Sequence, residues 1–330
     1  MPDTIVRPPF DPELAVFLSA LGARGPFTLT PESVARMRRL DVTEDELDER
    51  LRSRGWERRS VRVPGYLGEP IDLAVIQRTG RTGPTTGVYT IHGGGMVFGH
   101  HLGNLDSYDD WLLDHDVVLV SVDYRLAPEY PDPYPVEDCY AGLVWVAAHA
   151  AELGIDPERI VLAGQSAGGG LAAGTALLAR DRSGPAIAAQ VLVSPMLDDR
   201  DATVSAKQID GVGVADRQMT RFGWDALLGA RCGTEDVSEY AAPARATDLS
   251  HLPRTYIDCG SAEVFRDETV AFASGLWAAG VDAELHVWPG AFHGFTSMQP
   301  HAVISKRATA ALADWTERLL GARQPVAPRS

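Results

Sequence analysis

From about residue 60 onward, short apolar runs alternate with segments of helical periodicity. The runs are rich in β-branched residues and cover residues 60–63, 71–77, 87–91, 117–122, 159–163, 190–193, 255–258 and 284–288. Helical patterns lie between most of the later runs and after the last one, at residues 104–114, 136–153, 167–179, 267–279 and 301–320. This alternation predicts an α/β protein with a mostly parallel sheet that helices cover on both faces. Because no helix separates the first runs, we expect the leading edge of the sheet to be antiparallel.

Two segments do not fit this alternation. Residues 1–58 contain three amphipathic helical patterns, at 11–21, 31–40 and 43–52, and residues 200–243 contain a polar loop and one helical pattern at 216–228. We interpret both segments as a cap that packs outside the sheet. The catalytic core would then consist of residues 59–199 and 244–330.

Composition limits the partners and the compartment. The net charge of −15 argues against nucleic acid or an anionic membrane as a partner, since both attract a basic surface. The first residues do not resemble a signal peptide, and no apolar run approaches the roughly 20 residues of a membrane span. Three scattered cysteines, Cys139, Cys232 and Cys259, indicate free thiols rather than a disulfide framework. We therefore expect a cytoplasmic protein.

The strongest local motif is Gly164-Gln165-Ser166-Ala167-Gly168. An apolar run precedes it and a helical pattern follows it, which is the strand–turn–helix context of a nucleophile elbow. Glycines two positions on each side let the strand and the helix approach closely, and the serine hydroxyl projects at a helix N-terminus. The alternative is an ordinary glycine-rich turn or a phosphate loop, but no lysine follows to make a P-loop. We interpret Ser166 as a nucleophile.

A second glycine-rich motif, His92-Gly93-Gly94-Gly95-Met96, directly follows an apolar run. Consecutive glycines can direct several backbone N–H groups into one cavity, where they would stabilise the oxyanion of an acyl-transfer reaction. The N–H of Ala167, just after the serine, is expected to be a further donor. Alone, the motif would indicate only a flexible turn. We expect His92 to shape this loop rather than to transfer protons.

A serine nucleophile needs a base and an acid that orients the base. His293 lies in a loop after the last apolar run, which fits the chain order serine, acid, histidine. The acid should follow the preceding strand, where the candidates are Asp258, Glu263, Asp267 and Glu268. Asp258 lies within the strand, and Asp267 and Glu268 begin a helix, where acids are common for capping alone. Position therefore favours Glu263.

Five motifs together resemble the hormone-sensitive-lipase-like α/β-hydrolases, the bacterial family IV esterases. They occupy residues 92–96, 123–129, 156–160, 164–169 and 293–295, and the resemblance extends from about residue 65 to residue 320. It implies the α/β-hydrolase fold, with an eight-stranded sheet and a cap made of the N-terminal helices and an insertion after the sixth strand. The stretch 263–267, Glu-Val-Phe-Arg-Asp, matches the family's Asp-Pro-Leu-Arg-Asp, so the acid is here a glutamate.

The resemblance also implies the activity and the role of each residue. The protein would be a serine carboxylesterase for short- to medium-chain acyl esters, acting through an acyl-enzyme. Ser166 is the implied nucleophile, His293 the base, Glu263 the acid, and the N–H groups of Gly94, Gly95 and Ala167 form the oxyanion hole. Neither a metal nor an organic cofactor is expected. Homodimers recur in this family, commonly through the final strand and helix, so residues 284–320 are the candidate interface, although the sequence does not determine the oligomeric state.

Several features stay open at this stage. We expect the substrate pocket to be lined by Met96, Val97 and Phe98 beyond the glycine loop and by the cap residues Phe17, Phe222 and Trp224. The same triad could cleave an amide or an N-acetyl group. A non-catalytic receptor is a more remote alternative, because receptors that resemble this family lack the histidine that His293 supplies here. Arg125, Glu129, Glu137 and Asp138 are expected to form a structural polar network.

Overall fold

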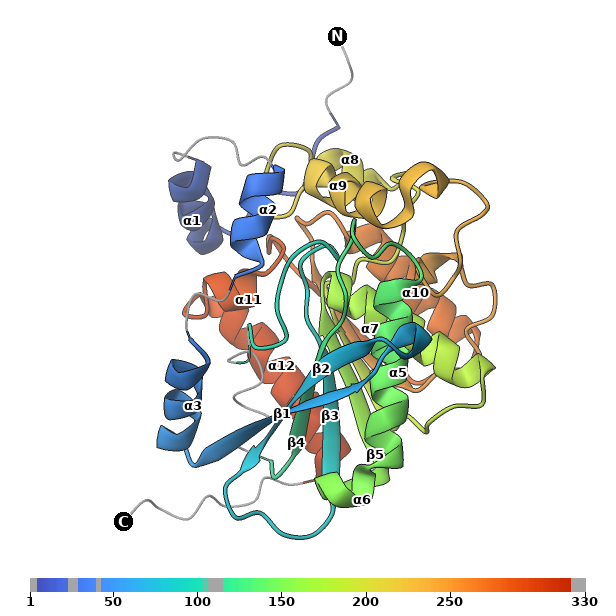
Figure 1. Ribbon diagram of the computed structural model, residues 1–330. Helices are drawn as coiled ribbons and strands as arrows, with labels where there is room; N and C mark the ends of the chain where they lie inside the picture. The colour runs from blue at the N-terminus through green and yellow to red at the C-terminus, as the bar shows by residue number, and fades with distance from the viewer. Residues whose placement is uncertain (1–4, 23–28, 40–42, 104, 106–114, 322–330) are drawn as a thin grey trace.

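A single eight-stranded sheet forms the centre of the protein. The computed structural model describes residues 5–22, 29–39, 43–103, 105 and 115–321, and the sheet has the order β1-β2-β4-β3-β5-β6-β7-β8 (Figure 1). All eight predicted runs lie in strands, which span β1 Trp56–Pro64, β2 Pro70–Arg78, β3 Thr85–Ile91, β4 Val118–Asp123, β5 Ile155–Gln165, β6 Ala189–Val193, β7 Arg254–Gly260 and β8 Ala283–Trp288.

Strand direction agrees with the sequence prediction. β1 pairs with β2, and β2 with β4, in antiparallel register. The remaining neighbours, from β4 through β3 to β8, are parallel. The antiparallel leading edge and the parallel remainder of the sheet are therefore both confirmed. The parallel strands end on one edge, where an α/β sheet of this kind positions its ligand site.

Helices cover both faces because neighbouring strand residues point in opposite directions. Leu162 of β5 belongs to the core beneath α5, α7 and α10, whereas Val161 and Ala163 belong to the opposite core, which includes Trp315 of α12. The helices span α1 Pro12–Gly22, α2 Pro31–Met37, α3 Glu44–Ser53, α5 Tyr134–Ala148, α6 Ala150–Leu153, α7 Ala167–Asp181, α8 Val204–Gln208, α9 Arg217–Leu228, α10 Arg266–Ala278, α11 Phe295–Met298 and α12 Val303–Leu320. The helices on both faces are thus confirmed.

Three of the predicted helices have different outcomes. The pattern at 136–153 is interrupted at His149, which separates α5 from α6; the His149 ring nitrogen Nδ1 lies 2.8 Å from Trp145 O. The predicted helix at 104–114 lies almost wholly outside the described residues. The predicted helix at 216–228 is confirmed as α9, with Asp216 as its N-cap, accepting a hydrogen bond from Met219 N.

Figure 1 shows α1, α2, α8 and α9 gathered at one end of the sheet, beyond the carboxyl ends of its parallel strands. The ring of Phe17 in α1 stacks on Phe292, with ring centroids 5.7 Å apart. α9 approaches the glycine loop so closely that a Cβ on Gly223 would lie 2.7 Å from Gly95 O. α3 instead packs beside β1, and its Leu47 and Leu51 enter the core beneath the sheet. The division into cap and core at the residues given above stays a prediction.

Among the described residues, no helix combines the length and apolar character needed to cross a membrane. The three cysteines are free thiols, as expected; Cys139 and Cys259 are buried and Cys232 is partly exposed.

Candidate active site

Ser166 occupies a sharp turn between β5 and α7. Its backbone has φ of 58°, a left-handed conformation that is strained for a residue with a side chain and that recurs at functional sites. A Cβ on Gly164 would collide with Gly168 O, and one on Gly168 would collide with Ile91 O. The flanking glycines therefore permit the close approach of strand and helix that the motif predicts. Ser166 N donates to Val193 O at 2.9 Å, which fixes the turn to β6.

The glycine loop after β3 presents two backbone donors beside this serine. Gly94 and Gly95 have φ of 114° and 59°, and both line the same cavity as Ser166. Within the described part of the chain, neither of their N–H groups has a hydrogen-bond acceptor. Ala167 is the first residue of α7, so its N–H has no partner within the helix. All three groups are thus available to an oxyanion.

His92 is held within the loop. Its ring stacks on Tyr124 with centroids 4.2 Å apart, and its Nδ1 lies 2.8 Å from Gly93 O. Tyr124 in turn donates its hydroxyl to His92 O at 2.9 Å. Burial lowers the pKa of His92 to about 4, so the ring is neutral at neutral pH. These contacts agree with a role in shaping the loop.

His293 and Glu263 lie next to each other, and His293 lines the same cavity as Ser166. The Nδ1 atom of His293 lies 3.5 Å from Glu263 Oε1. Glu263 is fully buried, and its Oε2 accepts hydrogen bonds from Gly260 N at 2.7 Å and Ser194 Oγ at 2.8 Å. Two donors therefore orient the carboxylate so that its other oxygen faces the imidazole.

The other three candidate acids have different partners. Asp267 accepts from Ser205 N and Arg266 Nε, both at 2.8 Å. Glu268 accepts from Leu197 N at 2.7 Å, and burial raises its pKa well above the ordinary value. Asp258 accepts from Trp288 Nε1 at 3.0 Å, and burial raises its pKa to about 6. Among the described acids, Glu263 is thus the one next to His293.

A cavity of about 400 Å³ opens over these groups, and both Ser166 and His293 line it. Of the predicted pocket residues, Val97 and Phe98 lie on its wall. Apolar side chains that the sequence did not suggest complete most of the wall: Leu29, Met37, Met196, Val214, Ala215, Met219, Phe265 and Met298. Such a cleft, apolar with a few polar groups at one point, suits a small organic ligand.

Four predicted pocket residues do not line this cavity. Met96 has a positive φ and turns its side chain into the core, where it is 2% exposed. Phe17 packs on Phe292, and Phe222 packs against the core beneath α9. Trp224 is also 2% exposed and lines a separate cavity next to Asp199. These four side chains pack against other parts of the protein, so their assignment to the pocket was wrong.

The predicted polar network divides into separate pairs. Arg125 forms a two-pronged ion pair with the fully buried Asp138, at 2.8 and 2.6 Å. Glu129 instead pairs with Arg38, and Glu137 with Arg182. A network that joins all four predicted residues was therefore wrong, although the Arg125–Asp138 pair at its centre was correct.

Comparison with known proteins identifies the family of this chain. A family model described as the alpha/beta hydrolase fold matches residues 88–297. The carboxylesterase NlhH of Mycobacterium tuberculosis is 36% identical over 309 residues, which cover 89% of this chain and 91% of NlhH. The esterase LipI of the same species is 37% identical over 214 residues, 63% of this chain and 65% of LipI.

Solved structures give the same result. A bacterial heroin esterase superposes with a TM-score of 0.82 at 36% identity, covering 94% of this chain and 98% of the other. A thermostable esterase from Pseudomonas putida superposes with a TM-score of 0.81 at 28% identity, covering 97% and 99%. The chain therefore belongs to the hormone-sensitive-lipase-like, bacterial family IV branch of the α/β hydrolases, and it is a carboxylic ester hydrolase.

Proposed function

We propose that the protein hydrolyses short- to medium-chain acyl esters through an acyl-enzyme formed on Ser166, with His293 as the base and Glu263 as the acid. The observation that carries this proposal is that one cavity is lined by Ser166, His293 and the two donor glycines, while the buried Glu263 holds the far side of the imidazole. The 3.5 Å separation of His293 and Glu263 is typical of a site without ligand, where such contacts tighten when substrate binds.

The reaction follows from these positions. His293 accepts the proton of the Ser166 hydroxyl as the oxygen attacks the ester carbonyl, and Glu263 stabilises the imidazolium. The negative charge that develops on the carbonyl oxygen is stabilised by the N–H groups of Gly94, Gly95 and Ala167. His293 then protonates the departing alcohol. Water, deprotonated by His293, attacks the acyl-enzyme, and the acid is released with Ser166 restored. In this scheme His293 transfers the protons, and Glu263 and the backbone N–H groups stabilise the charges that develop.

Cavity size and lining support the substrate class. A volume of about 400 Å³ with a mainly apolar wall suits a compact acyl group. Bulky side chains from the cap and the core, such as Met219 and Phe265, form part of this wall and limit the length of chain that fits. A graded series of p-nitrophenyl esters should show kcat/KM highest for short or medium acyl chains. A continuous rise towards long chains would contradict this part of the proposal.

A covalent probe tests the nucleophile. A fluorophosphonate should label the native protein on Ser166, and Ser166→Ala should abolish the label. Ser297→Ala is the matched control, because Ser297 also lines the cavity but lies in α11, away from the elbow; it should remain labelled. Labelling of Ser166→Ala as strongly as the native protein would contradict the proposal.

A further inference from the structure

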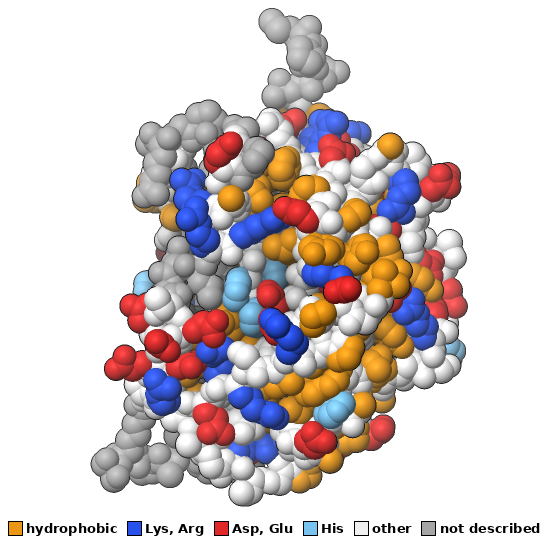
Figure 2. All heavy atoms as spheres, viewed as in Figure 1, with side chains coloured by type: hydrophobic (Ala, Val, Ile, Leu, Met, Phe, Trp, Pro, Cys, Tyr) orange, Lys and Arg blue, Asp and Glu red, His pale blue; other side chains and the backbone are white. Residues whose placement is uncertain are grey.

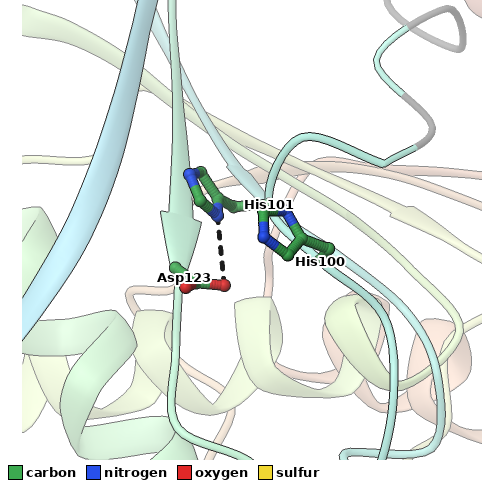
Figure 3. Close-up of side chains that lie close together, drawn as sticks. All are labelled: His100, His101 and Asp123. Atoms are coloured by element: carbon green, nitrogen blue, oxygen red, sulfur yellow. Dashed lines mark ion pairs between the residues drawn. The ribbon is translucent and has the colours of Figure 1, made fainter. Parts of the chain in front are cut away.

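Two histidines and an aspartate lie together at the rim of the active-site cavity. His100 and His101 follow the glycine loop, and Asp123 ends β4; Figure 3 shows the three side chains grouped between the loop and the strand. Each offers one ligand atom, and these atoms all lie within 4.8 Å of one another. Among the described residues, no other group of three or more metal-ligating side chains converges in this way. None of the three belongs to the proposed triad.

We propose that His100, His101 and Asp123 bind one divalent transition-metal ion of the Zn²⁺ class, and that the bound ion slows ester hydrolysis by moving His100. Imidazole nitrogens with a carboxylate oxygen are ligands that such ions prefer, and three protein ligands leave a position for water. The ion would be a regulator and not a cofactor, because the proposed reaction proceeds without it.

The geometry of His101 and Asp123 already suits a shared cation. His101 Nδ1 and Asp123 Oδ1 are 3.1 Å apart, close to the roughly 3.3 Å that separates neighbouring ligand atoms around a tetrahedral Zn²⁺ with bonds of about 2.0–2.1 Å. Despite this short distance, Nδ1 makes no aligned hydrogen bond, and His101 is only 6% exposed. Among the described residues, the ion pair with Asp123 is thus the one polar contact of this buried nitrogen, and a cation between the two groups would give each of them a direct bond in its place.

The backbone around the pair is held in place before any ion binds. Ser121 Oγ donates to His101 O at 2.7 Å, and Gly103 N donates to His100 O at 2.8 Å. The rings of His100 and His101 stack with centroids 4.5 Å apart. Because His101 and Asp123 already lie 3.1 Å apart, we expect His100 to move most, and the local cost includes the hydrogen bond that its Nδ1 accepts from Leu102 N at 3.1 Å. A preformed turn of this kind lowers the entropy cost of binding an ion.

The site opens to solvent and to the cavity. The Asp123 side chain is 37% exposed and His100 is partly exposed, whereas His101 is buried. Figure 2 shows that acidic and basic side chains mix over this face of the molecule, with some histidines between them. His100 itself lines the cavity together with Gly94, Gly95 and Phe98. Because an ion on Asp123 and His101 would draw His100 towards them, it would alter the wall next to the oxyanion donors.

Metal binding can be measured without any substrate. The full chain, freed of metal with EDTA and then dialysed, is titrated with ZnCl₂ by calorimetry. We expect one Zn²⁺ per chain, and we expect Asp123→Asn and His100→Ala each to weaken binding by more than about tenfold, since even an outer partner of a ligand contributes that much. His286→Ala is the matched control, because His286 Nε2 lies 2.9 Å from Glu284 Oε1 but without a third ligand; binding should be unchanged.

Activity gives the second measurement. Each variant's ester turnover is compared with and without Zn²⁺, so that differences in basal activity cancel. Zn²⁺ should inhibit the native protein and the His286→Ala variant, and it should inhibit Asp123→Asn at correspondingly higher concentration. If the native chain binds no Zn²⁺, or if Asp123→Asn binds it as tightly as the native chain, the proposed site is wrong. Unchanged inhibition in Asp123→Asn would place the inhibitory ion elsewhere, on His293 and Glu263 for example, and would overturn the coupling to His100.

Discussion

Glu263 differs from the neighbouring acids in its surroundings. It is completely buried, it receives two hydrogen bonds on one oxygen, and its other oxygen faces His293. Asp267 is half-buried and caps the start of α8 through Ser205. Position in the turn was enough to favour Glu263 from the sequence, but the donors Gly260 N and Ser194 Oγ could not be foreseen, because Ser194 comes from a different strand end.

This difference predicts unequal effects of two isosteric substitutions. Glu263→Gln should lower kcat by about 10³–10⁴-fold, because an amide no longer stabilises the imidazolium and favours the wrong tautomer. Asp267→Asn, the matched control, should lower kcat far less. Steady-state kinetics on a p-nitrophenyl ester measure both. Comparable losses in the two variants would mean that Glu263 is not the acid.

Burial of the Asp258 carboxylate lowers the free energy of unfolding. Burial raises the pKa of this carboxyl from 3.8 to about 6, and its Oδ1 has no hydrogen-bond partner among the described residues. Between these two values the folded protein retains a proton that the unfolded chain releases, so stability falls as pH rises through this window. Above about pH 6 the free energy of unfolding is lower by the full amount, on the order of 3 kcal/mol for a pKa shift of about two units.

Asp258→Asn should therefore raise the free energy of unfolding at a pH near 8 and change it little at a pH near 3, where the carboxyl of Asp258 is largely protonated in both the folded and the unfolded chain. The amide oxygen can still accept the hydrogen bond from Trp288 Nε1. Urea unfolding at the two pH values measures the difference. An equal effect at both would show that the charge of Asp258 is not the cause.

At the scale of elements, the cavity is made where α2 and α9 meet the loops at the end of the sheet. α9 packs on the glycine loop through Gly223, and α2 contributes Met37 to the cavity wall. Arg38, the C-cap of α2, fastens that helix to the loop region. It donates to Val97 O and Ala127 O, both at 2.7 Å, and forms an ion pair with Glu129 at 2.8 Å. One side chain therefore links the cap to two loops of the core.

Removal of this link should affect substrate binding more than chemistry. Arg38→Ala should raise KM by roughly tenfold, equivalent to about 1.4 kcal/mol or the loss of one or two hydrogen bonds, with a smaller change in kcat. Arg39→Ala is the matched control, since Arg39 carries the same charge but its side chain, within the described part of the chain, makes only a 3.4 Å hydrogen bond to Ala35 O of α2. Kinetics on a medium-chain ester separate KM from kcat. Equal effects of the two substitutions would contradict the role given to Arg38.

At the scale of the whole molecule, local patterns predicted the fold better than they predicted the cavity. The apolar runs were recognisable as strands because their β-branched residues favour extended backbone, and the central strands β3, β4 and β6 are in addition buried on both faces. The elbow at Ser166 and the glycine loop were recognisable because each depends on adjacent residues. The cavity wall depends instead on how separate segments pack. Leu29, Met37 and Val214 lie in segments outside the sheet and carry no local signal. The aromatic residues chosen from the sequence lie elsewhere, because Phe17 stacks on Phe292 and Trp224 is buried.

The proposed activity depends on Ser166, His293 and Glu263, from three distant segments of the chain, acting together on one hydroxyl group. Ester turnover by Ser166→Ala tests it most directly, because the substitution removes one oxygen and leaves His293, Glu263 and the oxyanion donors intact. We predict a fall in kcat of about 10⁵–10⁶-fold, the scale for loss of a triad nucleophile. A variant that is correctly folded, free of contaminating esterase and still within about tenfold of the native rate would contradict the account.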